Sequence, residues 1–149
     1  MRYLIVVMGV LAAFPSVAAP PETTPSPPPA KEPAAKDPAA AAIAGTWRYA
    51  KDPTGAVATD PIYEGSTITF APDGRYTFRL AQFPRPLEGT WELRGAEADT
   101  VRVHTEYGQG RRNHLTLTLR RDAGGAVTGM VVREGDGSTG ARLYVRESG

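Results

Sequence analysis

The chain has 149 residues, and its 17 Lys and Arg against 16 Asp and Glu give a formal net charge of +1 at neutral pH. A charge so close to zero gives no electrostatic argument for a nucleic-acid or membrane partner. The chain contains no cysteine, which excludes disulfides, thiol catalysis, cysteine metal ligands and a lipoprotein anchor. We therefore expect the folded part to be held together by packing alone.

Residues 1–18 have the layout of a secretory signal peptide. One positive charge, Arg2, precedes an apolar run that reaches Phe14, and the small residues Ser16 and Ala18 stand before the expected cleavage point. An uncleaved anchor is the alternative, but the run is shorter than the roughly 20 residues that a spanning helix needs. We expect a periplasmic or secreted protein whose signal peptide is removed.

Residues 19–42 consist of Pro, Ala, Thr, Ser and charged residues, with no aromatic residue and no aliphatic residue larger than Ala. Such a segment cannot bury enough apolar surface to offset the entropy lost on ordering. We predict a disordered, partly polyproline linker, with a recognition role for its Pro-rich run at residues 25–29 as the alternative. The folded domain is then expected over residues 43–149.

From Gly45 onward apolar and polar residues alternate, and turn residues interrupt them at short intervals, which is typical of antiparallel sheet. In the clearest hairpin, Pro72 presets a negative φ and Gly74 accepts a positive one. No segment after Ile43 has a helical period. The expected strands are residues 45–49, 66–70, 75–80, 87–93, 100–107, 114–121, 127–132 and 141–146.

The order of these strands predicts an all-β fold, an eight-stranded antiparallel up-and-down barrel. Closure leaves no exposed sheet edge. A two-sheet sandwich is the alternative, but no connection looks like the long return that a Greek key requires. The alternation predicts that Leu80, Leu87 and Leu93 point inward. On the last strand it predicts an inward face of Ala141, Leu143 and Val145 and an outward face of Arg142, Tyr144 and Arg146.

The two tryptophans, Trp47 and Trp91, lie on predicted inward faces, each two residues after a glycine. Gly45 and Gly89 would let the backbone bend sharply or approach its neighbour closely. An eight-stranded barrel is just wide enough for its own side chains to fill. We therefore expect both indoles to pack in the core, with contact to a ligand as the alternative.

This order of motifs resembles the lipocalin-like, calycin-type small β-barrels of bacterial secreted proteins. Their pattern has G-x-W on the first strand, here residues 45–47, then "itF..DGrY.f" at residues 68–78 and "GtWel" at residues 89–93. The resemblance implies that an arginine near the last strand stacks across Trp47 and closes one end of the barrel. Arg146 is the first candidate for this role and Arg142 the next.

A ligand site in the lumen is a further expectation for such a barrel. Its candidate residues are Trp47, Tyr49, Phe70, Tyr76, Phe78 and Trp91. The short strands and the missing C-terminal helix argue against a roomy ligand cup. We therefore expect a mostly packed interior.

The two histidines lie on the two strands of one predicted hairpin. If Tyr107 pairs with Asn113, then His104 and His114 are diagonal neighbours on the outer surface. With Glu106 they could hold zinc or copper. Structural metal sites usually have four ligands, so solvated surface histidines are the simpler interpretation, and no cofactor is expected.

No serine stands in a G-x-S-x-G turn, no glycine-rich loop precedes a helix, and no carboxylate pair faces the predicted lumen. Asp73 is most simply a turn residue, so we expect no enzymatic activity. The predicted domain contains thirteen Arg and a single Lys, with doublets at residues 111–112 and 120–121. Guanidinium groups suit phosphate or carboxylate ligands, so an anionic envelope polymer is an alternative partner.

These observations predict an exported, non-enzymatic binding module for a small apolar ligand or a component of the cell envelope. The alternative is an inhibitor of a secreted or periplasmic hydrolase, because small eight-stranded inhibitor barrels look similar and some insert the residues ahead of the barrel into the protease cleft. A purely structural envelope protein is the third hypothesis. We expect no nucleic-acid partner and no insertion into a membrane once the signal peptide is cut.

Overall fold

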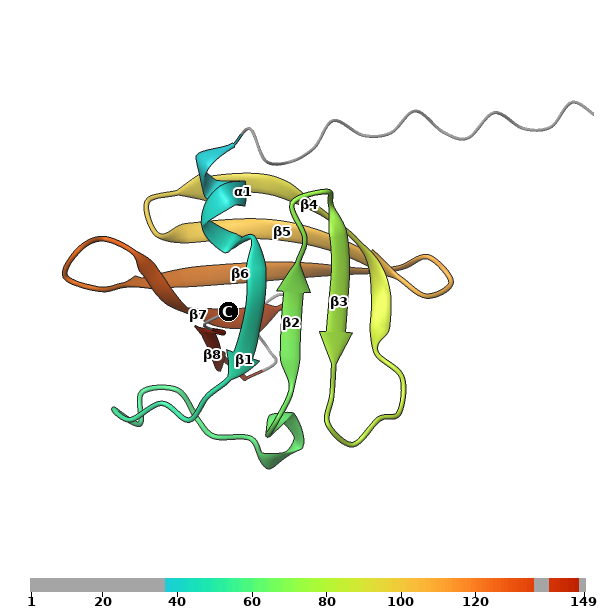
Figure 1. Cartoon of the computed structure of the whole chain (residues 1–149), viewed down its shortest axis with the longest axis horizontal. Coiled ribbons are helices and arrows are strands. Elements are labelled where there is room, and N and C mark those ends of the chain that lie inside the picture. The colour runs from blue at the N-terminus through green and yellow to red at the C-terminus, as the bar shows by residue number, and fades with distance from the viewer. Residues whose placement is uncertain (1–36, 136–139, 148–149) are drawn as a thin grey trace, which may run out of the picture. The chain divides into compact units, whose positions relative to one another are not determined.

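Eight antiparallel strands pair in chain order, and the last pairs back with the first, so the sheet closes into a barrel (Figure 1). The structure, a computed structural model, describes residues 37–135 and 140–147. The predicted up-and-down barrel is confirmed. Its strands are β1 (Gly45–Tyr49), β2 (Thr67–Phe70), β3 (Arg75–Arg79), β4 (Leu87–Glu97), β5 (Thr100–Tyr107), β6 (Arg111–Arg121), β7 (Val127–Glu134) and β8 (Arg142–Arg146).

The predicted signal peptide and residues 19–36 of the predicted linker lie outside the described residues. Within the described part, no helix has the length and apolar character needed to cross a membrane.

A short helix, α1 (Pro38–Ile43), precedes β1 where the sequence predicted linker. Asp37 caps it, because its Oδ1 accepts a hydrogen bond from the N–H of Ala39 at 2.8 Å. Ala40 and Ile43 are 2 % and 0 % exposed and belong to the barrel core. The predicted end of the linker at residue 42 is therefore wrong, because these two apolar side chains give the segment surface to bury.

The last strand faces the opposite way from the prediction. Tyr144 is 0 % exposed and Arg142 is 4 % exposed, whereas Val145 is 38 % exposed. Leu143 is buried on the outside of the barrel, in a second small cluster beneath the long connection between β1 and β2. The second cluster consists of Val57, Val131 and Leu143. Both neighbouring positions of β8 are therefore buried, and the alternation no longer distinguishes its two faces.

The glycines ahead of the tryptophans have the roles predicted for them. Gly45 has a φ of 127°, and a Cβ there would lie 3.0 Å from Nη1 of Arg146. A Cβ on Gly89 would lie 1.9 Å from the carbonyl oxygen of Glu106, because β4 and β5 approach very closely at this point. Only glycine fits at residue 89 without moving the backbone.

We expect Gly89→Ala to destabilise the barrel by about 3 kcal/mol or more, because an overpacked site costs roughly 1–3 kcal/mol even where side chains can yield, and here the obstacle is backbone. Gly95→Ala is the matched control on the same strand, since a Cβ there meets nothing within 4 Å. Urea unfolding of both variants would measure the difference. Equal midpoints for the two would contradict the close approach of β4 and β5.

The connection between β1 and β2 is fixed by one carboxylate. Asp52 accepts hydrogen bonds from the N–H groups of Thr54 and Val57, at 3.1 and 3.0 Å, and its Oδ2 lies 3.1 Å from Nη2 of Arg120 on β6. The hydrogen bond from Arg120 is the largest cause that lowers the pKa of Asp52 below its usual range. The connection is thereby held against the outer face of the barrel.

The lowered pKa makes the contribution of Asp52 to stability depend on pH. The charged carboxylate stabilises the fold above its unfolded pKa of about 3.9, and this contribution is lost as the pH falls below that value. We expect Asp52→Asn to unfold at a lower urea concentration than the parent at pH 7. The gap between the two midpoints should narrow at pH 3, and a gap that stays constant would contradict this role.

Candidate functional site

One end of the barrel is closed by α1 and by Arg146. The guanidinium carbon of Arg146 lies 4.2 Å from the ring centroid of Trp47. Its Nη2 and Nη1 donate to the carbonyl oxygens of Ala42 and Ala44 at 2.7 and 2.9 Å. The indole N–H of Trp47 donates to the carbonyl oxygen of Ile43 at 2.8 Å. The stacking predicted for Arg146 is therefore present, and α1 covers this end (Figure 1).

The residues predicted for a ligand site in the lumen lie in the core or against it. The core contains Trp47, Tyr49, Phe70, Tyr76 and Trp91, and Phe78 packs against it. The ring of Phe70 lies 5.6 Å from that of Tyr76 and 5.5 Å from that of Trp91. These rings contact one another, as expected for core residues, and their contact with a ligand stays a prediction.

The end of the barrel opposite α1 carries a cluster of tyrosine rings. Tyr49 contacts Tyr63 and Tyr144, with ring centroids 6.1 and 5.8 Å apart. Tyr76 lies opposite Phe70 and Gly89 instead, and its ring is 6.5 Å from that of Tyr107. Burial raises the pKa of Tyr144 to about 12, and burial followed by the charge of Glu134 raises that of Tyr76 still further. Both phenols therefore stay neutral at physiological pH.

Arg142 lies inside this end, although the alternation predicted it to face outward. Its Nη2 is 2.6 Å from Oε1 of Glu134, which makes an ion pair, although the angles are not those of a hydrogen bond. Its guanidinium carbon lies 4.2 Å from the ring centroid of Tyr63. The Nε atom is buried and has no hydrogen-bond partner within the described residues. The ion pair and the tyrosine ring together make burial of this charge tolerable.

An apolar groove of about 310 Å³ adjoins the tyrosine cluster. It is lined by Phe78, Leu80, Phe83, Pro84, Arg85 and Leu87. Phe78 connects it to the cluster, because its ring lies 6.4 Å from that of Tyr63. Phe83 and Leu87 are 54 % and 44 % exposed, so they present apolar surface to any ligand in the groove. Leu87 lies opposite Phe78, on the predicted inner face, but it is at the barrel rim and is therefore 44 % exposed. Leu80 follows the end of β3 at Arg79 and lines the same groove.

The connection between β3 and β4 shapes the groove at the end opposite α1 (Figure 1). The N–H of Phe83 donates to the carbonyl of Leu80 at 3.1 Å, which turns the chain. Pro84 and Pro86 fix their own φ angles and restrict the residues before them to extended conformations. Of the lining residues only Phe78 was among those predicted to contact a ligand, although a phenylalanine beside two prolines in a turn was a signal that could have indicated the others.

The histidines meet, but not in the predicted register. His104 lies directly opposite His114, and their rings stack with centroids 4.1 Å apart. Nδ1 of His104 accepts from Nη2 of Arg94 at 3.0 Å, and Glu106 forms an ion pair with Arg112 at 3.1 Å. Within the part of the chain that the structure describes, no three His, Cys, Asp or Glu side chains are placed to hold a metal ion, so the predicted alternative of a metal site is not supported.

Comparisons with known proteins give no match to this chain among protein-family models, curated proteins or solved structures.

We expect Arg146→Lys to lower the free energy of unfolding by about 1–3 kcal/mol, because the ammonium loses both the stacking on Trp47 and the forked donation to two carbonyls. Arg48→Lys is the control, since Arg48 is exposed on β1 and its partner among the described residues is Glu147. An exposed pair of this kind is worth under about 1 kcal/mol. Urea unfolding, monitored by tryptophan fluorescence, measures the free energy of unfolding of both variants. An equal decrease in the two variants would contradict the role of Arg146 in closing the barrel.

Proposed function

We propose that this chain is an exported, non-enzymatic, lipocalin-like module that binds a small apolar ligand at the open end of its barrel. Three observations support this proposal. The barrel has eight antiparallel strands in closed order, its first-strand tryptophan stacks on an arginine of the last strand, and residues 1–18 have the layout of a signal peptide.

The apolar groove beside the tyrosine cluster is the single observation that carries the binding role. Its volume of about 310 Å³ lies at the lower end of the range of ligand pockets, about 300–1,000 Å³. Five of its six lining residues are apolar. A small apolar ligand that binds in the groove would therefore bury its own apolar surface together with that of Phe83 and Leu87.

The rim of the groove favours a ligand with an acidic or polar end. Arg85 is the only charged residue among those lining the groove, and it has no acidic partner within the described residues. Guanidinium groups bind carboxylate and phosphate in a forked geometry. The groove would hold the apolar body while Arg85 orients the acidic end.

The neutral fluorophore N-phenyl-1-naphthylamine tests the groove directly. We expect its emission to rise on titration with the protein and expect Leu87→Ser to weaken binding by about 1–2 kcal/mol, roughly 5- to 30-fold, because the substitution removes part of the apolar wall. Val145→Ser is the matched control, since Val145 is 38 % exposed on the outer face of β8. Equal affinities of the two variants would remove the groove as the binding site.

A deletion separates this proposal from inhibition of a hydrolase through the residues ahead of the barrel. Because α1 packs into the core, the deletion is limited to residues 19–36. Binding of the fluorophore should survive it, since no groove residue is removed. Hydrolase inhibition that is present in the full chain and absent after the deletion would favour the inhibitor hypothesis instead.

A further inference from the structure

Most arginines of the barrel are already held by other groups of the protein. Arg112, Arg120 and Arg121, from the two sequence doublets, pair with Glu106, Asp52 and Asp99. Arg146 is bound to backbone carbonyls instead. Within residues 37–135 and 140–147, the other arginines with no acidic partner are Arg79, Arg85, Arg102, Arg111 and Arg133. Of these five arginines, Arg111 alone belongs to a sequence doublet, so the guanidinium groups available to a ligand lie mainly elsewhere.

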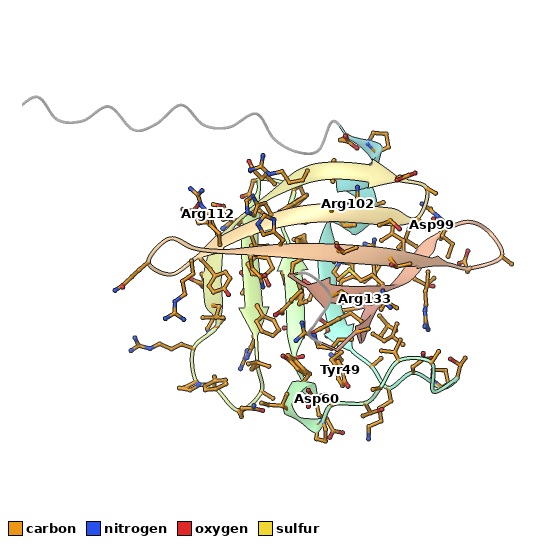
Figure 2. The ribbon with its side chains drawn as sticks, turned by 180° about the vertical axis from the view of Figure 1, so that it is seen from behind. Tyr49, Asp60, Asp99, Arg102, Arg112 and Arg133 are labelled. Atoms are coloured by element: carbon orange, nitrogen blue, oxygen red, sulfur yellow. The ribbon has the colours of Figure 1, made fainter. Side chains whose placement is uncertain are left out.

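Two of these arginines belong to one row on the outside of the barrel. Arg102 on β5 lies opposite Thr116 on β6, and Thr116 lies opposite Arg133 on β7. Both arginines are exposed, and in Figure 2 their labels lie on the two sides of β6. Because neighbouring strands are about 4.8 Å apart, the two Cα atoms are roughly 10 Å apart, so both guanidinium groups can reach one acidic chain that crosses β6.

The next row along these strands extends the basic surface. It contains the stacked pair His104 and His114, with Arg94 bonded to Nδ1 of His104. Glu92 lies opposite His104 on β4 and is in contact with Arg94. The basic side chains on this face outnumber the acidic ones, although the chain as a whole is nearly neutral.

We infer that the row Arg102, Thr116 and Arg133 is a docking site for an acidic polysaccharide on the outer wall of the barrel. The two arginines bind acidic groups of the polymer, and the hydroxyl of Thr116 bonds to a sugar hydroxyl between them. This site lies on the outer wall of β5–β7, whereas the apolar groove lies at β3 and the start of β4, so it is additional to the proposed function.

The side chains of this face favour a polysaccharide over a nucleic acid. Single-stranded nucleic acids are held by aromatic side chains on which the bases stack. The outward positions of β5 and β6 hold Thr, Arg, His and Glu, and no aromatic ring besides the two imidazoles, which stack on each other. Thr100, Thr116 and Thr118 are partly buried on this face and supply hydroxyls that suit a sugar chain.

Alginate, a polymer of uronic acids, is the probe, and binding to the full chain is measured by calorimetry at low salt. We expect Arg102→Gln combined with Arg133→Gln to weaken binding at least about tenfold and to lower the salt dependence of log K by about one for each arginine removed. Arg48→Gln combined with Arg79→Gln is the matched control, since it removes the same charge from β1 and β3. This control should bind alginate as the parent does.

Equal loss of alginate binding in both double variants would overturn the site, because the effect would then follow net charge alone. If single-stranded DNA of the same length and charge binds as tightly as alginate, the polysaccharide is not the specific partner. Fluorophore binding in the groove should be unchanged in Arg102→Gln/Arg133→Gln, so failure of this inference is distinguishable from failure of the proposed function. Thermal melting of each variant confirms that the barrel is folded.

Discussion

The contact between Arg146 and Trp47 joins the three parts of the chain that must meet for the barrel to close. Trp47 is on the first strand, Arg146 is on the last, and the guanidinium donates to carbonyl oxygens at the end of α1. The last carbonyls of a helix have no partner within the helix. One side chain therefore satisfies these carbonyls, covers the indole and fixes the pairing of β8 with β1.

Because α1 and Arg146 close this end, the proposed ligand site lies at the opposite end. There β3 and β4 support a connection that contains two prolines. The prolines restrict the backbone conformations of the connection, so it stays ordered although Phe83 is exposed. Arg142 is buried at the same end and pairs with the partly exposed Glu134. Loops that bind ligands commonly stand on such a rigid scaffold.

The sequence predicts the barrel well because one face of nearly every strand is buried and the other is not. It fails at β8, where Leu143 and Tyr144 are both buried, since the connection between β1 and β2 covers the outer face. It fails at α1, since alanines do not reveal what they will pack against. The pairing of His104 with His114 depends on the conformation of the short turn at residues 108–110. The apolar groove also includes Phe83, Pro84 and Arg85, which lie in a connection where no strand alternation applies.

Net charge is a poor guide to the surface of this barrel, because pairing decides which charges remain available. Arg120 is held by Asp52 and Arg121 by Asp99, so the doublet that stands out in the sequence is already neutralised. Arg102 and Arg133 are 31 residues apart in the chain and stand out in no sequence pattern. The antiparallel register of β5, β6 and β7 places them in one row, and the same alternation that buries Val101 and Val132 turns them outward. A local basic surface can therefore arise on a chain whose total charge argues against one.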